Sequence, residues 1–246
     1  MNNLAVIGLI WARIASPNSW SAAGITLVFA LFAWVVRGVT TSGAIAGAVV
    51  CFALIRGVGW SGFLALCAVF LLTWIATRIG YARKLRQGTA ESRRGRDALQ
   101  VFANLAIAAG CAVMFAFGHN PRFLAALAAA LAEASGDTVA SEIGQAVGGV
   151  PRLVTSWKSV PIGTDGAITV RGTLAGVLAV ATVIAICFAT GVVDQRAAFI
   201  GAGAAIAATL LDSLMGATLE RDRRLGNNGV NFLSTLFAAA IAFVLS

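Results

Sequence analysis

Four acidic residues lie within segments that are otherwise almost entirely apolar. Glu133, Asp137 and Glu142 belong to one such segment, and Asp212 belongs to another further along the chain. An ionisable side chain is unfavourable inside a membrane span, so each carboxylate is a candidate for a functional role. Carboxylates without adjacent cations suit protons, a cation pathway or a metal, and Mg²⁺ usually binds one or two of them together with substrate phosphates.

The spacing of these carboxylates predicts which of them act together. Glu133, Asp137 and Ser141 follow one another at intervals of four residues, which places them on one face of a helix. Glu142 lies about 140° around the helix from Asp137, but the two can share one ion if the helix opens near Gly144. The alternative is that some of these carboxylates are protonated or hydrogen-bonded packing residues.

A polar segment between residues 151 and 166 is the second candidate site. It combines Arg152 and Lys158 with hydroxyl residues and with Gly163 and Gly166. Glycine readily adopts positive φ, which allows successive backbone amides to converge on an anion. The segment lacks the Gly-x-x-x-x-Gly-Lys-Ser/Thr pattern of a P-loop, and the alternative interpretation is an ordinary solvated loop.

The composition of the chain is that of an integral membrane protein. Of 246 residues, 59% are hydrophobic and 11% are charged, and the mean hydropathy is +0.88. Soluble domains are typically about half apolar and about a quarter charged, so this chain has too few polar residues to cover a soluble globule. Its apolar runs have the length of membrane-spanning helices, and we predict an all-α, polytopic transmembrane bundle of about eight (seven to nine) spans.

The expected spans occupy most of the chain, which we interpret as a single transmembrane domain, 1–246. Within its N-terminal part, 1–36, residues 4–15 form either a short retained span or an interfacial helix, because the basic start of a cleaved signal peptide is missing. The other expected spans are 20–36, 43–55, 60–79, 98–118, 122–144, 172–190, 197–219 and 230–245.

Most of the basic residues fall in polar segments that alternating spans would place on one side of the membrane. Short loops rich in Lys and Arg mark the cytoplasmic side, so we expect a multi-pass protein of the cell inner membrane. The net charge of +8 could also attract nucleotide phosphates or anionic lipid, but its distribution over separate loops argues against nucleic acid as a partner. The segments expected on the cytoplasmic side are 37–42, 80–97, 145–171 and 220–229.

Other residues have a structural interpretation. His119, the single histidine, stands in a short loop, which disfavours chemistry that depends on a histidine base. The cysteines lie inside apolar segments without the spacing of a metal site and are interpreted as small buried hydrophobes: Cys51, Cys67, Cys111 and Cys187. Small residues that predict close contacts between helices are Gly43, Gly47, Gly172, Gly176, Gly201, Gly203, Ala204 and Ala208.

Together these features favour phosphoryl transfer. The chain offers carboxylates for a divalent ion and basic loops for phosphates, and both are expected at the cytoplasmic face. Phosphoryl transfer depends on positioning and charge neutralisation more than on covalent chemistry by the protein. The sequence contains no recognisable Ser-His-Asp set, haem ligand or dinucleotide-binding fingerprint.

Several strings of residues resemble a family of integral membrane proteins that includes chloroplast phytyl-phosphate kinase and is related to the dolichol and phytol kinases. The chain differs from the usual pattern at Gly136 and Val139, where alanine and tryptophan are expected, and at Asp165, where a small uncharged residue is expected. The strings are 41–44 (TSGA), 95–104 (GRDALQVFAN), 136–144 (GDTVASEIG), 151–155 (PRLVT), 160–164 (VPIGT), 211–217 (LDSLMGA) and 231–233 (NFL).

The resemblance implies a membrane kinase that uses Mg²⁺ and transfers the γ-phosphate of CTP, or of another nucleoside triphosphate, to an isoprenoid monophosphate. Phytyl or geranylgeranyl phosphate would then give the diphosphate. In this interpretation Asp137, Glu142 and Asp212 hold Mg²⁺, and Lys158 acts with them in catalysis. The residues that would bind nucleotide or acceptor are Arg96, Gln100, Asn104, Ser141, Arg152, Thr155, Gly163, Thr164, Ser213 and Asn231.

Other functions stay open on the sequence alone. An isoprenoid alcohol kinase would need a carboxylate base such as Asp137 or Glu142, whereas a monophosphate acceptor is already anionic near neutral pH. An ion-coupled transporter, a nucleotidyl transferase or a lipid-phosphate binding protein would use the same carboxylates differently. The expected partners are the nucleotide, the isoprenoid phosphate lipid, the membrane and, for a homodimer, a second copy of the chain.

Overall fold

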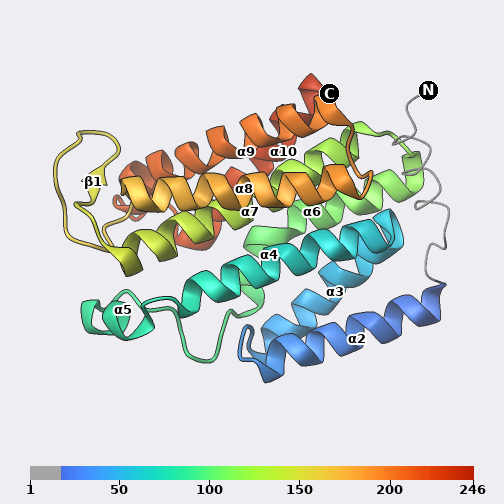
Figure 1. The fold of residues 1–246 in the computed structure, drawn as a ribbon, viewed down its shortest axis with the longest axis horizontal. Coiled ribbons are helices and arrows are strands. Elements are labelled where there is room, and N and C mark those ends of the chain that lie inside the picture. The colour runs from blue at the N-terminus through green and yellow to red at the C-terminus, as the bar shows by residue number, and fades with distance from the viewer. Residues whose placement is uncertain (1–17) are drawn as a thin grey trace.

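The computed structural model describes residues 18–246, which form nine α-helices, most of them running along the long axis of the molecule (Figure 1). Two residues each form strands β1 (Arg152–Leu153) and β2 (Ala167–Ile168), which pair in antiparallel fashion. The helices are α2 (Ser19–Val35), α3 (Thr41–Val58), α4 (Trp60–Arg78), α5 (Tyr81–Gln87), α6 (Ala98–Gly118), α7 (Arg122–Val147), α8 (Val170–Ala189), α9 (Gln195–Met215) with a π-helical continuation (Gly216–Glu220), and α10 (Asn227–Leu245).

Seven of these helices are long and apolar enough to cross a membrane: α3, α4, α6, α7, α8, α9 with its continuation, and α10. Helix α2 is also apolar but has 17 residues, slightly fewer than the roughly 20 that a bilayer core requires. The predicted all-α, polytopic bundle is therefore confirmed. The expected short span at 4–15 lies outside the described residues.

Short polar side chains define where several helices begin. Thr40, Thr169 and Asp194 each precede a helix and accept a hydrogen bond from a backbone N–H in its first turn. Asp97 and Gln100 form a reciprocal capping box at the start of α6. Because the first N–H groups of a helix have no partner within the helix, these side chains fix the boundaries between polar segments and spans.

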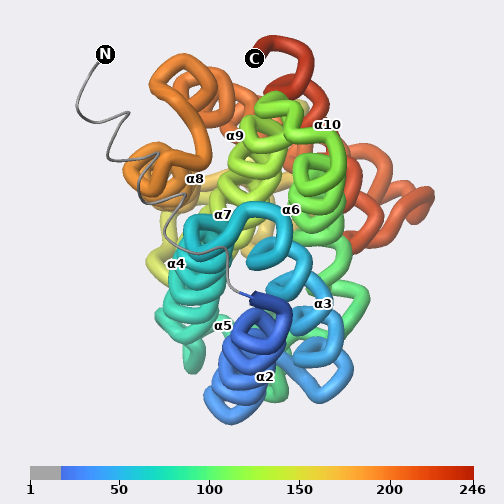
Figure 2. Tube along the Cα trace, turned by 90° about the vertical axis from the view of Figure 1, so that its right-hand side faces the viewer, coloured from blue at the N-terminus to red at the C-terminus, as the bar shows by residue number. Residues whose placement is uncertain are grey.

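Helix α7 is the centre of the bundle and contacts α4, α6, α8, α9 and α10 (Figure 2). Within its apolar window 78% of the residues are buried, against 22–39% in the other six candidate spans. Its first half is rich in alanine, and the run from Ala125 to Ala134 is buried throughout. Small side chains let five helices approach α7 closely, so polar groups on α7 are held away from the lipid.

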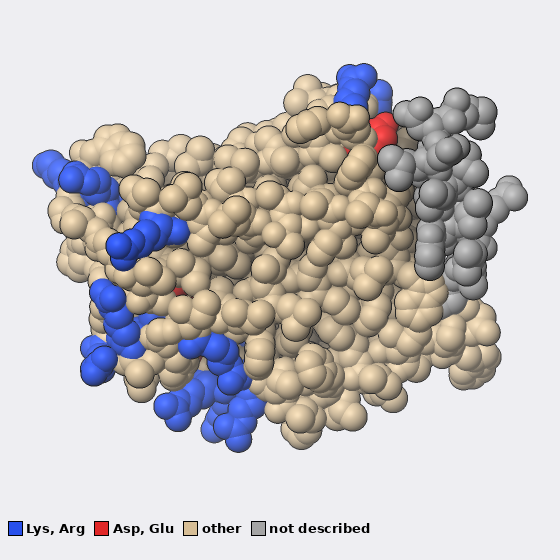
Figure 3. Space-filling model, viewed as in Figure 1, with Lys and Arg blue, Asp and Glu red and all other residues tan. Residues whose placement is uncertain are grey.

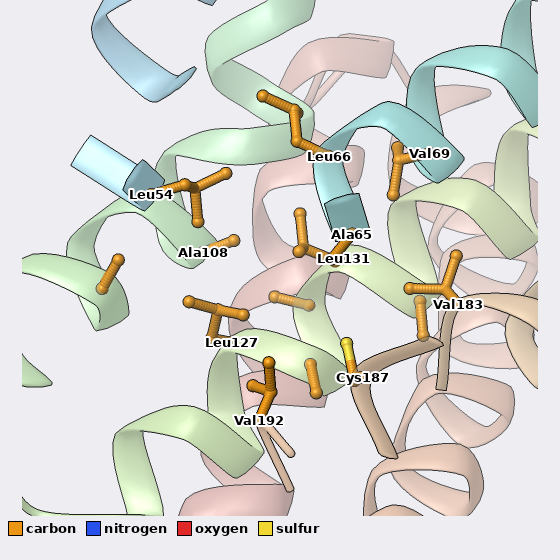
Figure 4. Close-up of a cluster of buried hydrophobic side chains, with 14 of the residues drawn as sticks. Leu54, Ala65, Leu66, Val69, Ala108, Leu127, Leu131, Val183, Cys187 and Val192 are labelled. Atoms are coloured by element: carbon orange, nitrogen blue, oxygen red, sulfur yellow. The ribbon is translucent and has the colours of Figure 1, made fainter. Parts of the chain in front are cut away.

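The apolar core surrounds this helix. Leu127 and Leu131 of α7 are fully buried and pack with side chains from α3, α4, α6 and α8 (Figure 4). Two of the cysteines, Cys51 and Cys187, are fully buried in the same cluster and are free thiols. They fill space as small hydrophobic groups, as the sequence predicts. Cys67 and Cys111, which were also predicted to be buried, are only partly buried.

Close backbone contact between α7 and α8 confirms part of the glycine pattern. A Cβ atom on Gly176 would lie 2.7 Å from the carbonyl oxygen of Gly136, and one on Gly172 would lie 2.4 Å from that of Ala140. Two other predicted contacts are wrong: a Cβ atom on Gly47 or Gly203 would meet nothing within 4 Å. Spacing alone does not show which face of a helix meets a neighbour.

The polar segments 36–40, 79–97, 148–169 and 221–226 connect the helices at one end of the bundle, together with α5 and the β1–β2 hairpin; we call this the loop end (Figure 1). On the face drawn in Figure 3, most of the Lys and Arg side chains gather at this end, and a smaller group lies at the other. The sequence did not indicate α5 or the hairpin, because both are short and lack apolar periodicity. That the loop end faces the cytoplasm stays a prediction.

The α7–α8 contact predicts opposite effects for two glycine-to-alanine substitutions. Gly176→Ala should lower the free energy of unfolding by about 1–3 kcal/mol, because its methyl group has no space between the two backbones. Gly110→Ala on α6, where a Cβ atom would meet nothing within 4 Å, should be neutral or stabilise by up to about 1 kcal/mol through helix propensity. Thermal unfolding in detergent measures both. Equal effects of the two substitutions would show that the contact is not close.

Candidate functional site

A cavity of about 180 Å³ lies at the loop end between α7, α8, α9 and the segment 161–169. Acidic side chains from three parts of the chain line it: Asp137, Asp165, Asp212 and Glu220. None of its lining residues, all within the described part of the chain, is Lys or Arg. We call this space the acidic cavity, and its charge suits a cation better than an unaccompanied anion.

Asp137 of α7 and Asp212 of α9 face each other at this cavity and interact electrostatically. Ser234 of α10 donates a hydrogen bond of 3.0 Å to Oδ2 of Asp212. Glu133, one helical turn from Asp137, is 1% exposed, and its Oε1 has no hydrogen-bond partner among the described residues. Carboxylates in such proximity need a proton or a bound cation between them.

The irregular end of α9 positions Asp212 and the loop above it. After Met215 the helix widens into a π-helical turn, a feature often found at functional sites. A Cβ atom on Gly166, whose φ is 73°, would lie 2.3 Å from the backbone nitrogen of Ala217. Only a glycine in the left-handed region allows this approach, so segment 161–169 rests directly on the π-helical turn.

The segment 151–166 divides into a part at the cavity and a part away from it. Gly163 and Thr164 line the acidic cavity, and the φ of Gly163 is 83°, which confirms the predicted positive φ at both glycines. Arg152, Thr155 and Lys158 lie instead on the exposed outer part of the hairpin and line neither cavity described here. The Arg152 guanidinium donates to the carbonyl oxygen of Trp157 at 2.8 Å, so it shapes the hairpin tip.

Glu142 does not join Asp137 and Asp212. It forms a buried ion pair with Lys84 of α5 and accepts a hydrogen bond of 3.1 Å from the hydroxyl of Thr77. Lys84 is fully buried and also donates to two carbonyl oxygens at the end of α4. The structure therefore separates the predicted set of three carboxylates into a facing pair and a residue that anchors α5.

A larger cavity of about 380 Å³ lies on the other side of α7, between α2, α3, α4 and α6. Its interior is lined mainly by apolar side chains, and we call it the apolar cavity. Four arginines line it, at the loop end of the bundle: Arg37, Arg78, Arg93 and Arg96. Arg96 also interacts electrostatically with Asp137, so the two cavities approach each other near that carboxylate.

The remaining predicted residues fall around these two spaces. Gln100 and Asn104 line the apolar cavity, and the Asn104 side chain donates to the carbonyl oxygen of Gln100 at 2.8 Å. Asn231 of α10 donates to Oδ1 of Asn104 at 3.5 Å but lines neither cavity. Ser141 and Ser213 both line the acidic cavity. Nine of the predicted site residues thus border one cavity or the other: Arg96, Gln100, Asn104, Asp137, Ser141, Gly163, Thr164, Asp212 and Ser213.

The acidic cavity has a donor set that fits Mg²⁺ bound together with phosphates. In the described part of the chain, no three His, Cys, Asp or Glu side chains converge closely enough to hold a metal by themselves. Mg²⁺ commonly takes one or two carboxylates and completes its shell with water and substrate phosphates. The facing oxygens of Asp137 and Asp212, and the unpartnered Oε1 of Glu133 behind them, suit that mode.

Three basic residues near the two cavities were not predicted from the sequence to have a role there. Lys84, Arg78 and Arg93 belong to basic segments whose charge was interpreted as topogenic, and their side chains contact Glu142, Trp74 and Tyr81, respectively. The rarity of lysine is one weak signal that could have singled out Lys84, since Lys84 and Lys158 are the only lysines among the 18 basic residues. No pattern of spacing links Lys84 to Glu142, because α5 reaches α7 through tertiary packing.

Residues 24–239 match the family described as integral membrane protein DUF92. An uncharacterized membrane protein of Synechocystis sp. is 38% identical over 189 residues, which cover 75% of this chain and 73% of that protein. An uncharacterized membrane protein of Methanocaldococcus jannaschii is 33% identical over 90% of this chain and 91% of its own. The chloroplastic protein VTE6 of Arabidopsis thaliana is 32% identical over 94% of this chain and 73% of its own. No solved structure matches the chain significantly.

The buried ion pair predicts a strong effect when only one partner is removed. Lys84→Met should lower the free energy of unfolding by about 3–5 kcal/mol, because it leaves the Glu142 carboxylate buried without its cation. The double variant Lys84→Met/Glu142→Gln should recover much of this loss, since it removes both charges. Thermal or denaturant unfolding in detergent checks both variants. A double variant no more stable than the single one would contradict the pairing.

The contact of Gly166 with the π-helical turn predicts that alanine there detaches the loop. Gly166→Ala should increase hydrogen–deuterium exchange in segment 161–169 by about tenfold or more, since the added methyl group clashes with Ala217. Gly88→Ala is a matched control, because Gly88 also has a φ of 73° but a Cβ atom would meet nothing within 4 Å. If Gly88→Ala increases exchange around residue 88 as much as Gly166→Ala does in segment 161–169, the backbone conformation and not the contact is responsible.

Proposed function

The chain belongs to the integral membrane protein DUF92 family, and from this premise we propose that it is a membrane phosphotransferase acting on an isoprenoid phosphate. The donor is a nucleoside triphosphate, with CTP favoured, and the acceptor is an isoprenoid monophosphate such as phytyl or geranylgeranyl phosphate. The product is the diphosphate. We propose the cell inner membrane as its location, with the loop end in the cytoplasm, where nucleotide is available. The resemblance of its motifs to phytyl-phosphate kinase, and its similarity to chloroplastic VTE6, support this assignment.

The observation that carries the proposal is the facing of Asp137 and Asp212 at the loop end, beside a glycine-containing segment. They come from different helices, and both line a cavity that also contains Gly163 and Thr164. Two carboxylates that converge beside a loop with two glycines of positive φ match the needs of a metal-bound nucleotide. The arginine-lined cavity next to them supplies positive charge for a second phosphate.

Asp137 and Asp212 would hold Mg²⁺, which when bound would neutralise charge on the transferring phosphoryl group. Segment 161–169 would position the nucleotide, and Arg96 would orient the acceptor phosphate next to Asp137. An oxygen of the acceptor attacks the γ-phosphorus, the bond from that phosphorus to the β–γ bridging oxygen breaks, and the nucleoside diphosphate leaves with this oxygen. A monophosphate acceptor is already ionised near neutral pH, so the step requires no histidine base.

The proposal predicts that both facing carboxylates are required for turnover. Asp137→Asn and Asp212→Asn should each lower the rate of diphosphate formation by about 100-fold or more, because each removes charge that holds the cation. The assay incubates purified protein with Mg²⁺, CTP or ATP, and phytyl or geranylgeranyl phosphate, and detects the diphosphate by mass spectrometry.

Asp222→Asn is the matched control. Asp222 also lies at the loop end, but its side chain is 64% exposed, and its Oδ2 makes a weak ion pair with Nε of Arg224 at 3.9 Å. Loss of this charge should therefore change the rate by no more than about twofold. Absence of product from every nucleotide and acceptor, with folded protein, would refute the kinase proposal. Nucleotide-independent uptake into proteoliposomes that is lost in Asp212→Asn would instead establish an ion-coupled transporter. Release of pyrophosphate would indicate a nucleotidyl transferase.

A further inference from the structure

The apolar cavity has the form of a lipid-binding site with a cationic opening. Its volume of about 380 Å³ falls in the range of roughly 300–1,000 Å³ that is usual for small-ligand pockets. We propose that it holds the isoprenoid chain of a prenyl phosphate, with the phosphate at the arginines. The identification of this lipid as the acceptor rests on the proposed function, whereas the binding itself does not.

The cavity extends deep into the apolar part of the bundle. On α4 its lining runs from Arg78 to Leu66, and the twelve helical steps between these two residues correspond to a depth of about 18 Å. At the deep end Phe29 of α2, Leu105 of α6 and Ala134 of α7 also line it. A single flexible hydrocarbon chain suits this narrow apolar space, and burial of each of its methylenes contributes favourably.

The opening of the cavity carries more positive than negative charge, with four arginines and one acidic residue among the described residues that line it. Neither of the two salt bridges in the described residues involves an arginine that lines the cavity. The one acidic residue at the opening, Glu91, accepts hydrogen bonds from the Gln100 amide at 3.3 and 3.5 Å. Arginine binds phosphate oxygens through its planar fork of donors, so a phosphate monoester is the headgroup that this opening favours.

Two of these arginines are already held in place by their neighbours. Arg78 donates 2.6 Å to the carbonyl oxygen of Val36 and lies over the ring of Trp74. Arg93 lies over the ring of Tyr81. Because their side chains are partly ordered before any ligand binds, less conformational entropy is lost on binding.

Backbone contact also fixes the position of Arg96. Its backbone N–H donates to the carbonyl oxygen of Gly38 at 3.1 Å, and its carbonyl oxygen accepts from the backbone of Thr40 at 2.9 Å. A Cβ atom on Gly95 would lie 2.4 Å from the carbonyl carbon of Gly38, so the two segments lie backbone to backbone. The Arg96 side chain is thereby placed between the apolar cavity and Asp137.

The geometry connects lipid binding to the facing carboxylates. Arg96 lines the opening of the apolar cavity and interacts electrostatically with Asp137, which lines the acidic cavity. A phosphate at Arg96 would therefore lie beside the carboxylate pair, while its hydrocarbon chain would extend away from it. The arrangement separates the lipid and the proposed nucleotide on opposite sides of α7.

Gly47 offers a direct way to block the hydrocarbon part of the cavity. It lines the cavity, and a Cβ atom there would meet nothing within 4 Å, so a larger side chain has space to enter. Gly47→Phe should weaken binding of radiolabelled geranylgeranyl phosphate by about tenfold or more, since the ring occupies volume needed by the chain. Binding of dimethylallyl phosphate, whose chain is short, should change by less than about twofold. The measurement is equilibrium binding in detergent without nucleotide or Mg²⁺.

Gly110→Phe is the matched control, because a Cβ atom on Gly110 also meets open space but the residue lines neither cavity. It should bind both lipids as the unmodified chain does, and thermal unfolding should show both variants folded. Equal binding of geranylgeranyl phosphate by Gly47→Phe and the unmodified chain would overturn the proposal, as would equal weakening in both variants.

A second variant tests the headgroup. Arg78→Gln should weaken binding of both prenyl phosphates but leave binding of geranylgeraniol, which lacks the phosphate, unchanged; equal weakening of the alcohol would contradict a phosphate at the opening. Displacement of the prenyl phosphate by excess phospholipid, but not by excess phytyl phosphate, would reassign the cavity to a bilayer lipid. These experiments measure binding and need no turnover. If the variants lose binding selectively but the unmodified chain forms no diphosphate, the assignment of the cavity holds and only the kinase function is refuted.

Discussion

Helix α7 carries three carboxylates through the interior of an apolar bundle, and each of them has to find a partner where water is scarce. The helix meets this constraint by its own composition, because its alanines and glycines allow α4, α6, α8, α9 and α10 to pack against it from all sides. Lipid is excluded from the polar groups, and neighbouring helices bring the donors. The close backbone contact of α7 with α8 and the hydrogen bond from Ser234 of α10 to Asp212 are consequences of this enclosure.

The same constraint divides the charges into two kinds. Glu142 is neutralised by Lys84 and hydrogen-bonded by Thr77, so its partners are complete and its role is to hold α5 against the bundle. Asp137 and Asp212 face each other, and the described residues that line their cavity include no Lys or Arg. A buried ion pair that is satisfied is a structural element, whereas facing carboxylates in a cavity are a candidate functional site.

The sequence predicts the spans well, because hydropathy and length dictate them and short polar caps such as Thr169 define their starts. It also predicts that Asp137, Asp212, Gly163 and Thr164 act together, and the structure brings these four residues to one cavity. It fails where tertiary packing decides. Helical periodicity relates Glu142 only to residues of its own helix, so the approach of Lys84 from α5 leaves no local signal. Likewise, the positive charge of Arg152 and Lys158 does not reveal that their side chains turn outward.

Irregular backbone at the end of a membrane span is unfavourable unless protein or water satisfies its polar groups. Here the π-helical turn after Asp212 is covered by segment 161–169, which approaches it at Gly166 without a side chain between them. The widened turn and the loop therefore depend on each other. Because both also line the acidic cavity, the contact that makes the irregular helix end tolerable also holds the loop above the carboxylates. Stability at the loop end and the shape of the site thus have one physical origin.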